Sequence, residues 1–164
     1  MFKNQTCQLI AECKKLSQAD LSKLMDISDK IATLNHNRFQ QFESSETKQA
    51  LLSYNGDVFK QLEKTLYTRA DWGFAQEHLL IVSGLYGLLR PLDLIAPYRL
   101  EMAIKLQSNN SNNLYDFWQK ELTNFKKKLD NKDSLKSLLE GYKPGGSVIS
   151  EDVPPGAIGV GRSR

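Results

Sequence analysis

The sequence feature that most constrains the fold is the stretch from residue 78 to residue 102, which reads HLLIVSGLYGLLRPLDLIAPYRLEM. It opens with a short apolar run over residues 79–82, bounded by Ser83 and Gly84. A run of this length with a glycine boundary predicts a buried strand, because a helix would need a longer apolar repeat. Gly84 and Gly87 permit backbone conformations and close approaches that other residues resist. We therefore expect a strand that ends in a tight, glycine-bounded turn.

The rest of this stretch is stiff and carries many polar side chains. Pro91 and Pro97 each fix one backbone dihedral and push the preceding residue toward extended geometry. The polar and aromatic candidates in the stretch are Tyr86, Arg90, Asp93, Tyr98, Arg99 and Glu101. Because binding and catalytic groups are favoured on loops held by a rigid scaffold, we expect a functional site to include this segment.

The turn at residues 84–87 is the first candidate binding element. A glycine-bounded turn can direct backbone N–H groups at a phosphate, since no side chain shields them. Its G-x-x-G spacing resembles the clamp loop of KH modules. The glycine hairpin of helix-hairpin-helix DNA motifs has its glycines one residue closer, so that likeness is imperfect. The alternative is a strand-to-helix turn in which Gly84 and Gly87 serve geometry alone. Both interpretations stay open.

The two arginines of the stretch also have two interpretations. Arg90 and Arg99 could grip a backbone phosphate, because the planar guanidinium suits phosphate and carboxylate groups. Alternatively, each arginine forms an ion pair with the next acid in the sequence, Asp93 or Glu101, and so pins the proline-rich loop. The sequence does not favour one over the other.

Two tyrosines and a lysine-rich segment complete the binding candidates. Tyr86 and Tyr98 could stack on a nucleic-acid base, although a buried tyrosine with a satisfied hydroxyl is the commoner case. The formal net charge is +3, and residues 120–143 hold seven lysines against four acids. Lys126 and Lys127 could contact phosphates through charge alone, or they could form the solvated end of a helix. The candidate partner is DNA, contacted through its phosphate backbone.

The sequence gives little support to metal or cofactor chemistry. His36 and His78 have no second ligand at metal spacing, and no Cys-x-x-Cys clip is present. There is no nucleotide-binding glycine loop or dinucleotide fingerprint, so we expect no metal and no cofactor. Cys7 and Cys13 point in different directions on one predicted helix, which favours reduced thiols in the cytoplasm. No apolar run is long enough to cross a membrane.

Outside the central stretch, apolar periodicity predicts a mainly helical chain. The expected helices cover residues 5–16, 17–25, 28–42, 45–54, 57–66, 71–78 and 114–129, with a second strand at 98–106. Ser17 and Asp20 have the spacing of a capping box. The residues expected to face inward include Ile31, Leu34, Phe39, Phe42, Val58, Leu62 and Leu66. These elements predict an α-dominated α+β fold.

The run SGLYGLLRPLDLIAPYRLEM resembles the central signature of the bacterial peroxide-stress protein YaaA family. The likeness continues upstream in MDISDKIATLNHNRF and YNGDVFKQLE and downstream in NLYDFWQKEL, so it covers roughly residues 9–129. It implies a cytoplasmic protein that protects cells against hydrogen peroxide by limiting free iron and that is linked to DNA binding. It also implies an incomplete α/β domain of that family with one or two strands.

Both ends of the chain depart from the family pattern. The family's first strand and its Ser-Pro-Ala-Lys segment have no counterpart, and its later segments are missing after about residue 129. Residues 145–164 instead resemble the closing coil of hexapeptide-repeat acyltransferases of the N-acetylglucosamine-1-phosphate uridyltransferase type. One coil of a solenoid cannot bury its own face. We therefore expect a partial YaaA-like domain at 1–140, truncated at both ends, and an unrelated, disordered tail at 141–164 without acyltransferase activity.

Three functional hypotheses follow. The first is a cytoplasmic peroxide-stress protein that binds nucleic acid without sequence preference, with an affinity that falls steeply with salt. The second is an enzyme that uses the cluster from Tyr86 to Glu101 on a small anionic substrate. The third is an inactive, truncated remnant. The family resemblance favours the first and makes enzymatic activity the less favoured hypothesis.

Overall fold

The computed structural model describes residues 2–108 and 111–130. This part of the chain is helix-rich with a few short antiparallel strands, which confirms the α-dominated α+β prediction. The helices are α1 (Lys3–Lys15), α2 (Gln18–Met25), α3 (Asp29–Gln40), α4 (Ala50–Ser53), α5 (Asp57–Lys60), α6 (Arg69–His78) and α7 (Leu114–Asp130), with short 3-10 turns at Phe42–Ser44 and Lys64–Leu66. The strands are β1 (Lys48–Gln49), β2 (Ile81–Ser83), β3 (Gly87–Leu89) and β4 (Leu94–Ile95).

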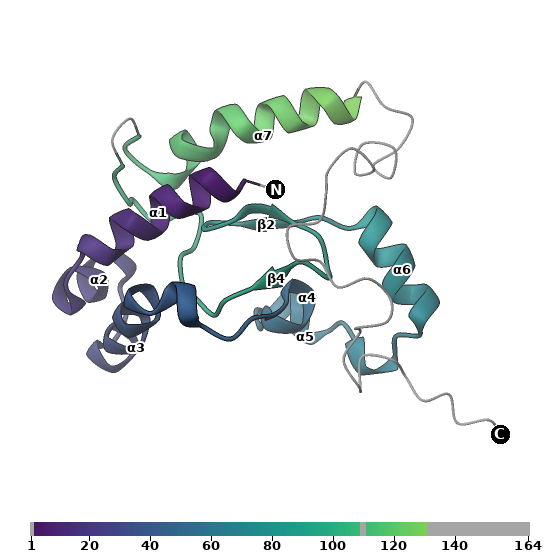
Figure 1. The fold of residues 1–164 in the computed structure, drawn as a ribbon, viewed down its shortest axis with the longest axis horizontal. Coiled ribbons are helices and arrows are strands. Elements are labelled where there is room, and N and C mark those ends of the chain that lie inside the picture. Colours follow the sequence, from purple (N-terminus) through teal and green to yellow (C-terminus); the bar gives the residue numbers. More distant parts are fainter. Residues whose placement is uncertain (1, 109–110, 131–164) are drawn as a thin grey trace.

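Helix α3 packs against both α1 and α2 at one end of the molecule, as Figure 1 shows. Helix α2 begins with the predicted capping box. The Ser17 hydroxyl accepts a hydrogen bond from Asp20 N at 3.1 Å, and the Asp20 carboxylate accepts one from Ser17 N at 3.0 Å. This arrangement satisfies two backbone donors that a helix start would otherwise leave unpaired, so the local sequence fixes where α2 begins.

Strands β2 and β3 form an antiparallel hairpin. Ile81 lies opposite Leu89 and Ser83 opposite Gly87. Gly87 has a φ of 74°, a left-handed conformation that glycine adopts without strain and that three-residue hairpin loops commonly require. The strand predicted at residues 79–82 therefore exists, displaced by one or two residues. The strand-to-helix alternative for the turn is wrong, because the chain folds back into β3.

The second predicted strand, at residues 98–106, is wrong. These residues contain no strand, and β4 lies earlier, where it pairs antiparallel with β1. Pro97 explains part of this difference, because proline has no N–H to extend the ladder beyond β4. Strand β1 occupies a segment that the apolar pattern assigned to the start of a helix, and the observed α4 is only four residues long.

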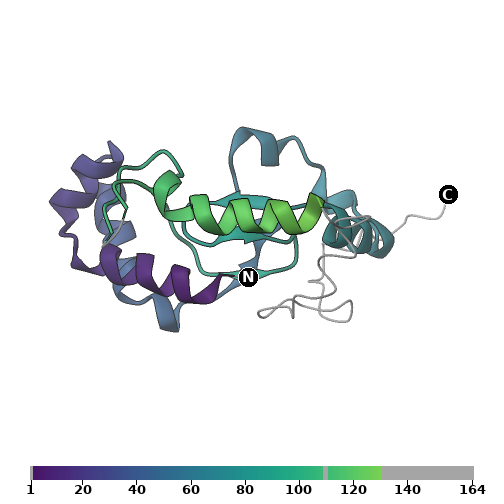
Figure 2. The same ribbon diagram turned by 90° about the horizontal axis from the view of Figure 1, so that it is seen from above.

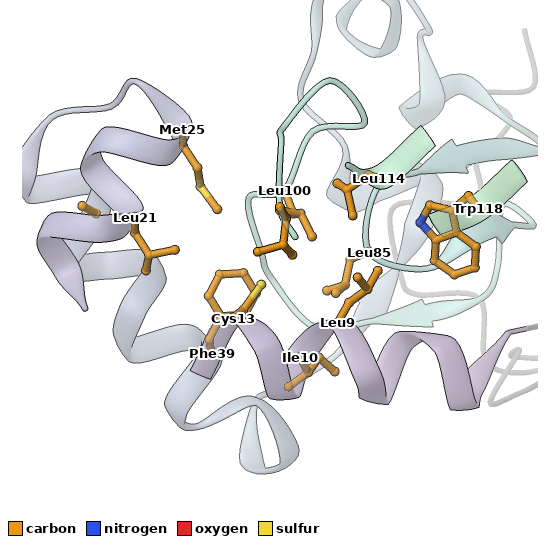
Figure 3. Packing of buried hydrophobic residues seen from close by; sticks show 12 residues of the cluster. Leu9, Ile10, Cys13, Leu21, Met25, Phe39, Leu85, Leu100, Leu114 and Trp118 are labelled. Atoms are coloured by element: carbon orange, nitrogen blue, oxygen red, sulfur yellow. The ribbon is translucent and has the colours of Figure 1, made fainter. Parts of the chain in front are cut away.

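The larger apolar cluster joins the three-helix end to the central stretch (Figure 3). Leu9 and Cys13 of α1 pack with Leu85 and Leu100, and Trp118 of α7 joins the same cluster. Helix α7 lies along the hairpin (Figure 2), and the Trp118 indole N–H donates to the Gly84 carbonyl at 2.8 Å. This buried hydrogen bond ties α7 to the turn between β2 and β3.

A second apolar cluster lies beneath the two short sheets. It contains Ala50, Leu51, Trp72, Ile81, Leu89, Leu92 and Ile95. Helix α6 contributes Trp72, and α6 begins with a second capping box between Thr68 and Asp71. The central stretch, residues 78–102, therefore contributes side chains to both apolar clusters.

Several residues that the pattern placed inward are exposed. On α3, Ala32, Asn35 and Phe39 face the neighbouring helices, whereas Ile31 and Leu34 are exposed. Val58 and Leu66, at 77% and 66% exposure, also lie outside the core because their helix is much shorter than expected. The inward prediction is confirmed for Phe39, while Phe42 and Leu62 are half-buried at the edges of the clusters. For Ile31 and Leu34, the apolar pattern correctly predicted a helix but assigned the wrong face of that helix to the core.

The boundary expected at residue 140 and the tail at 141–164 lie outside the described residues. In the part of the chain that the structure describes, no helix is long and apolar enough to cross a membrane.

Candidate anion-binding pocket

Tyr98 is the centre of a half-buried chain of hydroxyl groups in the central stretch. Its hydroxyl lies 2.6 Å from the Tyr54 hydroxyl and 2.6 Å from Ser83 Oγ. Tyr54 directly follows α4, and Ser83 is the last residue of β2. Ser83 Oγ also accepts a hydrogen bond from Tyr86 N at 3.0 Å. Short hydrogen bonds therefore connect the end of α4, the hairpin and the irregular segment after β4.

Burial keeps these phenols uncharged. Burial raises the pKa of Tyr98 far above its ordinary value, and the neighbouring phenol of Tyr54 raises it further. Burial also raises the pKa of Tyr54, against the hydrogen bonds from Ser83 and Tyr98. The two residues thus offer neutral hydroxyl groups for hydrogen bonding at physiological pH rather than phenolate charges.

A pocket of about 550 Å³ opens next to this chain. We call it the anion pocket; its lining residues are Arg38, Glu46, Thr47, Lys48, Leu52, Ser53, Tyr54, Ile95, Ala96, Pro97 and Tyr98. Arg38 comes from α3 and Lys48 from β1, so two elements far apart in the sequence place cations at one opening. Within the described residues neither cation has an ion-pair partner. Glu46 is the acid at this rim.

A third cation reinforces the positive charge near the pocket. Lys64 Nζ donates to the carbonyl oxygens of Leu51 at 3.1 Å and Tyr54 at 3.5 Å, which holds it close to the pocket wall. Burial lowers the pKa of Lys64, and the like charge of Lys48 lowers it further. The positive charges of Lys48 and Lys64 repel each other, so an anion bound near both would stabilise both ammonium groups.

Comparison with known proteins identifies the family. The family of peroxide stress protein YaaA matches residues 1–140 of the chain. The chain belongs to this family. Its curated relatives include the UPF0246 protein of Crocosphaera subtropica, 48% identical over 123 residues that cover 75% of this chain and 49% of the relative. The UPF0246 protein RC0754 of Rickettsia conorii is 47% identical over 139 residues, covering 85% of this chain and 55% of the relative. The chain spans about half the length of these relatives.

The glycine turn of this YaaA-family chain lies in the interior. Gly84 and Gly87 are both buried, and the Gly84 carbonyl accepts the Trp118 hydrogen bond. A Cβ atom at Gly84 would collide with the Leu100 carbonyl oxygen, and one at Gly87 would lie 2.7 Å from the Trp118 ring. The structure therefore gives these glycines a packing role and places the turn beneath α7 and the segment at Leu100.

The arginines of the central stretch differ in their surroundings. Arg90 and Asp93 are buried side by side, with Arg90 Nε 3.6 Å from Asp93 Oδ1, and Asp93 also accepts from Arg90 N at 2.8 Å. Arg99 is exposed and pairs with Glu101 at 3.2 Å. Both predicted ion pairs, Arg90–Asp93 and Arg99–Glu101, are thus present. Of the two arginines, Arg99 is the one that remains open to solvent.

The remaining predicted residues do not converge on one point. The Tyr86 hydroxyl accepts a hydrogen bond from Ala96 N at 3.0 Å, and burial raises the pKa of Tyr86 to about 12. Lys126 and Lys127 belong to the second half of α7 and do not line the anion pocket. Of the predicted candidates, Tyr98 lines this pocket.

The cations of the anion pocket were not among the predicted site residues. Arg38 lies in the last turn of α3, where a cation commonly complements the helix dipole, and the sequence around Lys48 carries no binding motif. Tyr54 belongs to the run YNGDVFKQLE that carries part of the family resemblance, which is the signal that could have singled it out. In the described part of the chain, no three residues among histidine, cysteine, aspartate and glutamate are grouped as a metal site would require.

Proposed function

We propose that this chain acts in the cytoplasmic response to hydrogen peroxide and binds nucleic acid through phosphate contacts at the anion pocket. The observation that carries the proposal is the pair of cations, Arg38 and Lys48, that have no ion-pair partner among the described residues and share one pocket rim. Membership of a family described as peroxide stress protein YaaA supports the cellular role. The link to limiting free iron, which the family resemblance implies, is part of the same proposal.

The chemistry of the rim fits a phosphodiester backbone. Arg38 can donate two hydrogen bonds in one plane to phosphate oxygens, and Lys48 adds a point charge. Tyr54, at the end of its hydrogen-bonded chain with Tyr98 and Ser83, offers a hydroxyl group beside them. Contacts of this kind do not read base identity, so the proposed binding is sequence-independent. The further phosphate contacts predicted at Arg99, Lys126 and Lys127 would lie outside the anion pocket.

A titration of labelled duplex DNA tests the binding part of the proposal. Arg38→Ala and Lys48→Ala are each expected to raise Kd by roughly 3- to 10-fold at fixed salt, equivalent to about 0.7–1.4 kcal/mol for one lost contact. Lys23→Ala is the matched control, because it removes one exposed lysine from α2, outside the pocket. Equal weakening by Lys23→Ala would mean that general charge, and not the pocket, binds the nucleic acid.

A survival assay tests the cellular part. The chain would be expressed in a bacterial strain that lacks its own family member, and colony survival after hydrogen peroxide treatment would be counted. We expect the wild-type chain to restore survival and the Arg38→Ala/Lys48→Ala double variant to restore much less. Full protection by the double variant would separate the peroxide role from the anion pocket.

A further inference from the structure

A second and larger cavity, of about 770 Å³, adjoins the anion pocket. Helix α1, the segment after α3, the β2–β3 hairpin and β4 form its walls. Its apolar lining comes from Phe2, Ile10, Phe42, Tyr86, Leu89 and Leu94. We call it the aromatic cavity. Its volume is within the range of about 300–1,000 Å³ that is typical of pockets for small molecules.

Two aromatic rings form one part of this cavity. The ring centroids of Phe42 and Tyr86 lie 6.3 Å apart with planes tilted by 39°, and both residues line the cavity. The Tyr86 ring cannot rotate away freely, because its hydroxyl accepts the Ala96 N–H. A flat aromatic molecule could therefore pack against a fixed aromatic surface.

A buried, incompletely bonded carboxylate lines the same cavity. Asp93 is 5% exposed, and its Oδ1 atom makes no hydrogen bond. The Arg90 Nε atom, 3.6 Å away, also lacks a hydrogen-bond partner. Buried polar atoms of this kind are normally satisfied by a partner. Because Oδ2 accepts the Arg90 N–H at 2.8 Å, Oδ1 is the carboxylate oxygen left for a donor that approaches from the cavity.

One of the two lysines that line the cavity is not neutralised by an acid of the described residues. Lys14 of α1 is neutralised by Glu43, whose carboxylate oxygens lie 2.7 and 2.8 Å from its Nζ atom. Lys3, the first residue of α1, has no ion-pair partner among the described residues. An anionic group on a ligand would therefore meet an unpaired cation at Lys3, while its donor group would meet Asp93.

We propose that the aromatic cavity binds a small planar aromatic molecule that carries an N–H or O–H donor and a carboxylate. The ring packs against Phe42 and Tyr86, the donor bonds to Asp93, and the carboxylate pairs with Lys3. This site is distinct from the anion pocket and goes beyond the proposed function, although Thr47 and Ala96 line both spaces.

Cys7 gives a direct readout of occupancy. It is exposed and lines the cavity, whereas Cys13 is buried and burial raises its pKa to about 12. An alkylating reagent will therefore modify Cys7 and leave Cys13 intact in the folded protein. The probe is indole propionate, which has a flat ring, an N–H donor and a carboxylate. We expect saturating probe to slow alkylation of Cys7 by about tenfold, a protection equivalent to about 1.4 kcal/mol.

Matched comparisons test each contact. The N-methyl derivative of the probe keeps the ring and the carboxylate but lacks the donor, so we expect at least about tenfold weaker protection. Lys3→Ala should weaken protection by indole propionate several-fold, whereas Lys15→Ala, which removes a lysine on the same helix outside the cavity, should not. Circular dichroism of each variant establishes that it is folded.

Two results would overturn the proposal. One is an alkylation rate of Cys7 that millimolar indole propionate leaves unchanged. The other is equal protection by the probe and its N-methyl derivative, which would mean that the cavity is apolar space without a specific polar contact.

Discussion

At the scale of single residues, Gly84 is the position where the fold leaves no room for a side chain. A Cβ atom there would collide with the Leu100 carbonyl oxygen and lie 3.1 Å from the Glu101 carbonyl carbon. These are backbone atoms, which cannot move aside as a flexible side chain would. The hairpin turn and the segment at Leu100 therefore pack directly against each other because residue 84 is glycine.

Gly84→Ala is expected to lower the free energy of unfolding by about 3 kcal/mol, near the upper end for overpacked interiors. Urea unfolding followed by circular dichroism measures this loss. Gly73→Ala is the matched control: a Cβ atom at this helical glycine meets nothing within 4 Å. It should stabilise the protein by about 0.5–1 kcal/mol, because alanine favours helix over glycine. Equal effects of the two changes would contradict the packing account.

The hydroxyl of Tyr98 is a second feature at this scale. Tyr98→Phe removes its hydrogen bonds to Tyr54 and Ser83 without changing the ring. We expect a loss of about 1–3 kcal/mol of unfolding free energy, because buried partners are left unsatisfied. Tyr67→Phe is the control, since the Tyr67 hydroxyl has no hydrogen bond within the described residues. A Tyr98→Phe protein as stable as the Tyr67→Phe protein would mean that the hydrogen bonds of the Tyr98 hydroxyl do not stabilise the fold.

The half-buried phenols also predict a pH dependence. Burial raises the pKa of Tyr54, Tyr86 and Tyr98 in the folded protein, so the folded state favours their protonated forms. Their contribution to stability is complete below the ordinary tyrosine pKa of about 10 and is lost as the pH rises above it. An ultraviolet titration of the folded protein should show these three ionising above the ordinary tyrosine pKa of about 10. Reversible ionisation at their ordinary pKa in folded protein would contradict this.

At the scale of secondary-structure elements, the helices with the best-defined N-termini are α2 and α6, each of which begins with a capping box. Ser17→Ala is expected to cost about 1 kcal/mol of unfolding free energy, whereas Ser28→Ala should cost much less. Ser28 occupies the same position before α3, but its side chain makes no capping hydrogen bond. Thermal unfolding of the two variants compares them directly, and equal losses would mean that the box contributes nothing particular.

Acid should weaken the same capping box. The hydrogen bonds from the Ser17 hydroxyl and the Ser17 backbone N–H lower the pKa of Asp20, so folding favours its carboxylate. Its contribution is present above the ordinary aspartate pKa of about 4 and is lost as the pH falls through the lowered folded value. The difference in stability between wild type and Ser17→Ala should therefore shrink in acid. A difference that stays constant would contradict the role of the charged carboxylate.

Elements whose determinants are local were predictable from the sequence, and the others were not. The Ser17–Asp20 box and the helix predicted at 114–129 depend on spacing within a few turns, and both are present. The pairing of β1 with β4 joins residues 48–49 to 94–95, which no local pattern encodes. On α3 the periodicity identified an amphipathic helix, but tertiary packing selected the Ala32–Phe39 face over Ile31 and Leu34.

At the scale of the whole molecule, the central stretch joins the two apolar clusters. Leu85 and Leu100 belong to the cluster of the three-helix end, while Ile81 and Ile95 belong to the cluster beneath the sheets. The glycines and Arg90 of this stretch are accordingly buried. Its distinctive composition reflects packing as much as chemistry.

The anion pocket forms only when distant segments of the chain have folded together. Arg38, Lys48, Tyr54 and Tyr98 come from four segments of the chain that folding brings to one opening. Tyr98 could be predicted as a candidate because it follows a stiff proline-rich segment. The cations could not be predicted, since a lone arginine or lysine in a helical pattern is usually an ordinary surface residue.

The salt dependence of DNA affinity tests the central claim most directly. Each phosphate contact contributes about 0.9 to the slope of log K against log salt concentration. The Arg38→Ala/Lys48→Ala double variant should therefore have a slope shallower than wild type by about 2, because two contacts are lost. A control double variant, Lys23→Ala/Lys30→Ala, removes two exposed lysines outside the pocket and should keep the wild-type slope. Identical slopes for wild type and the Arg38→Ala/Lys48→Ala protein would contradict phosphate binding at the anion pocket.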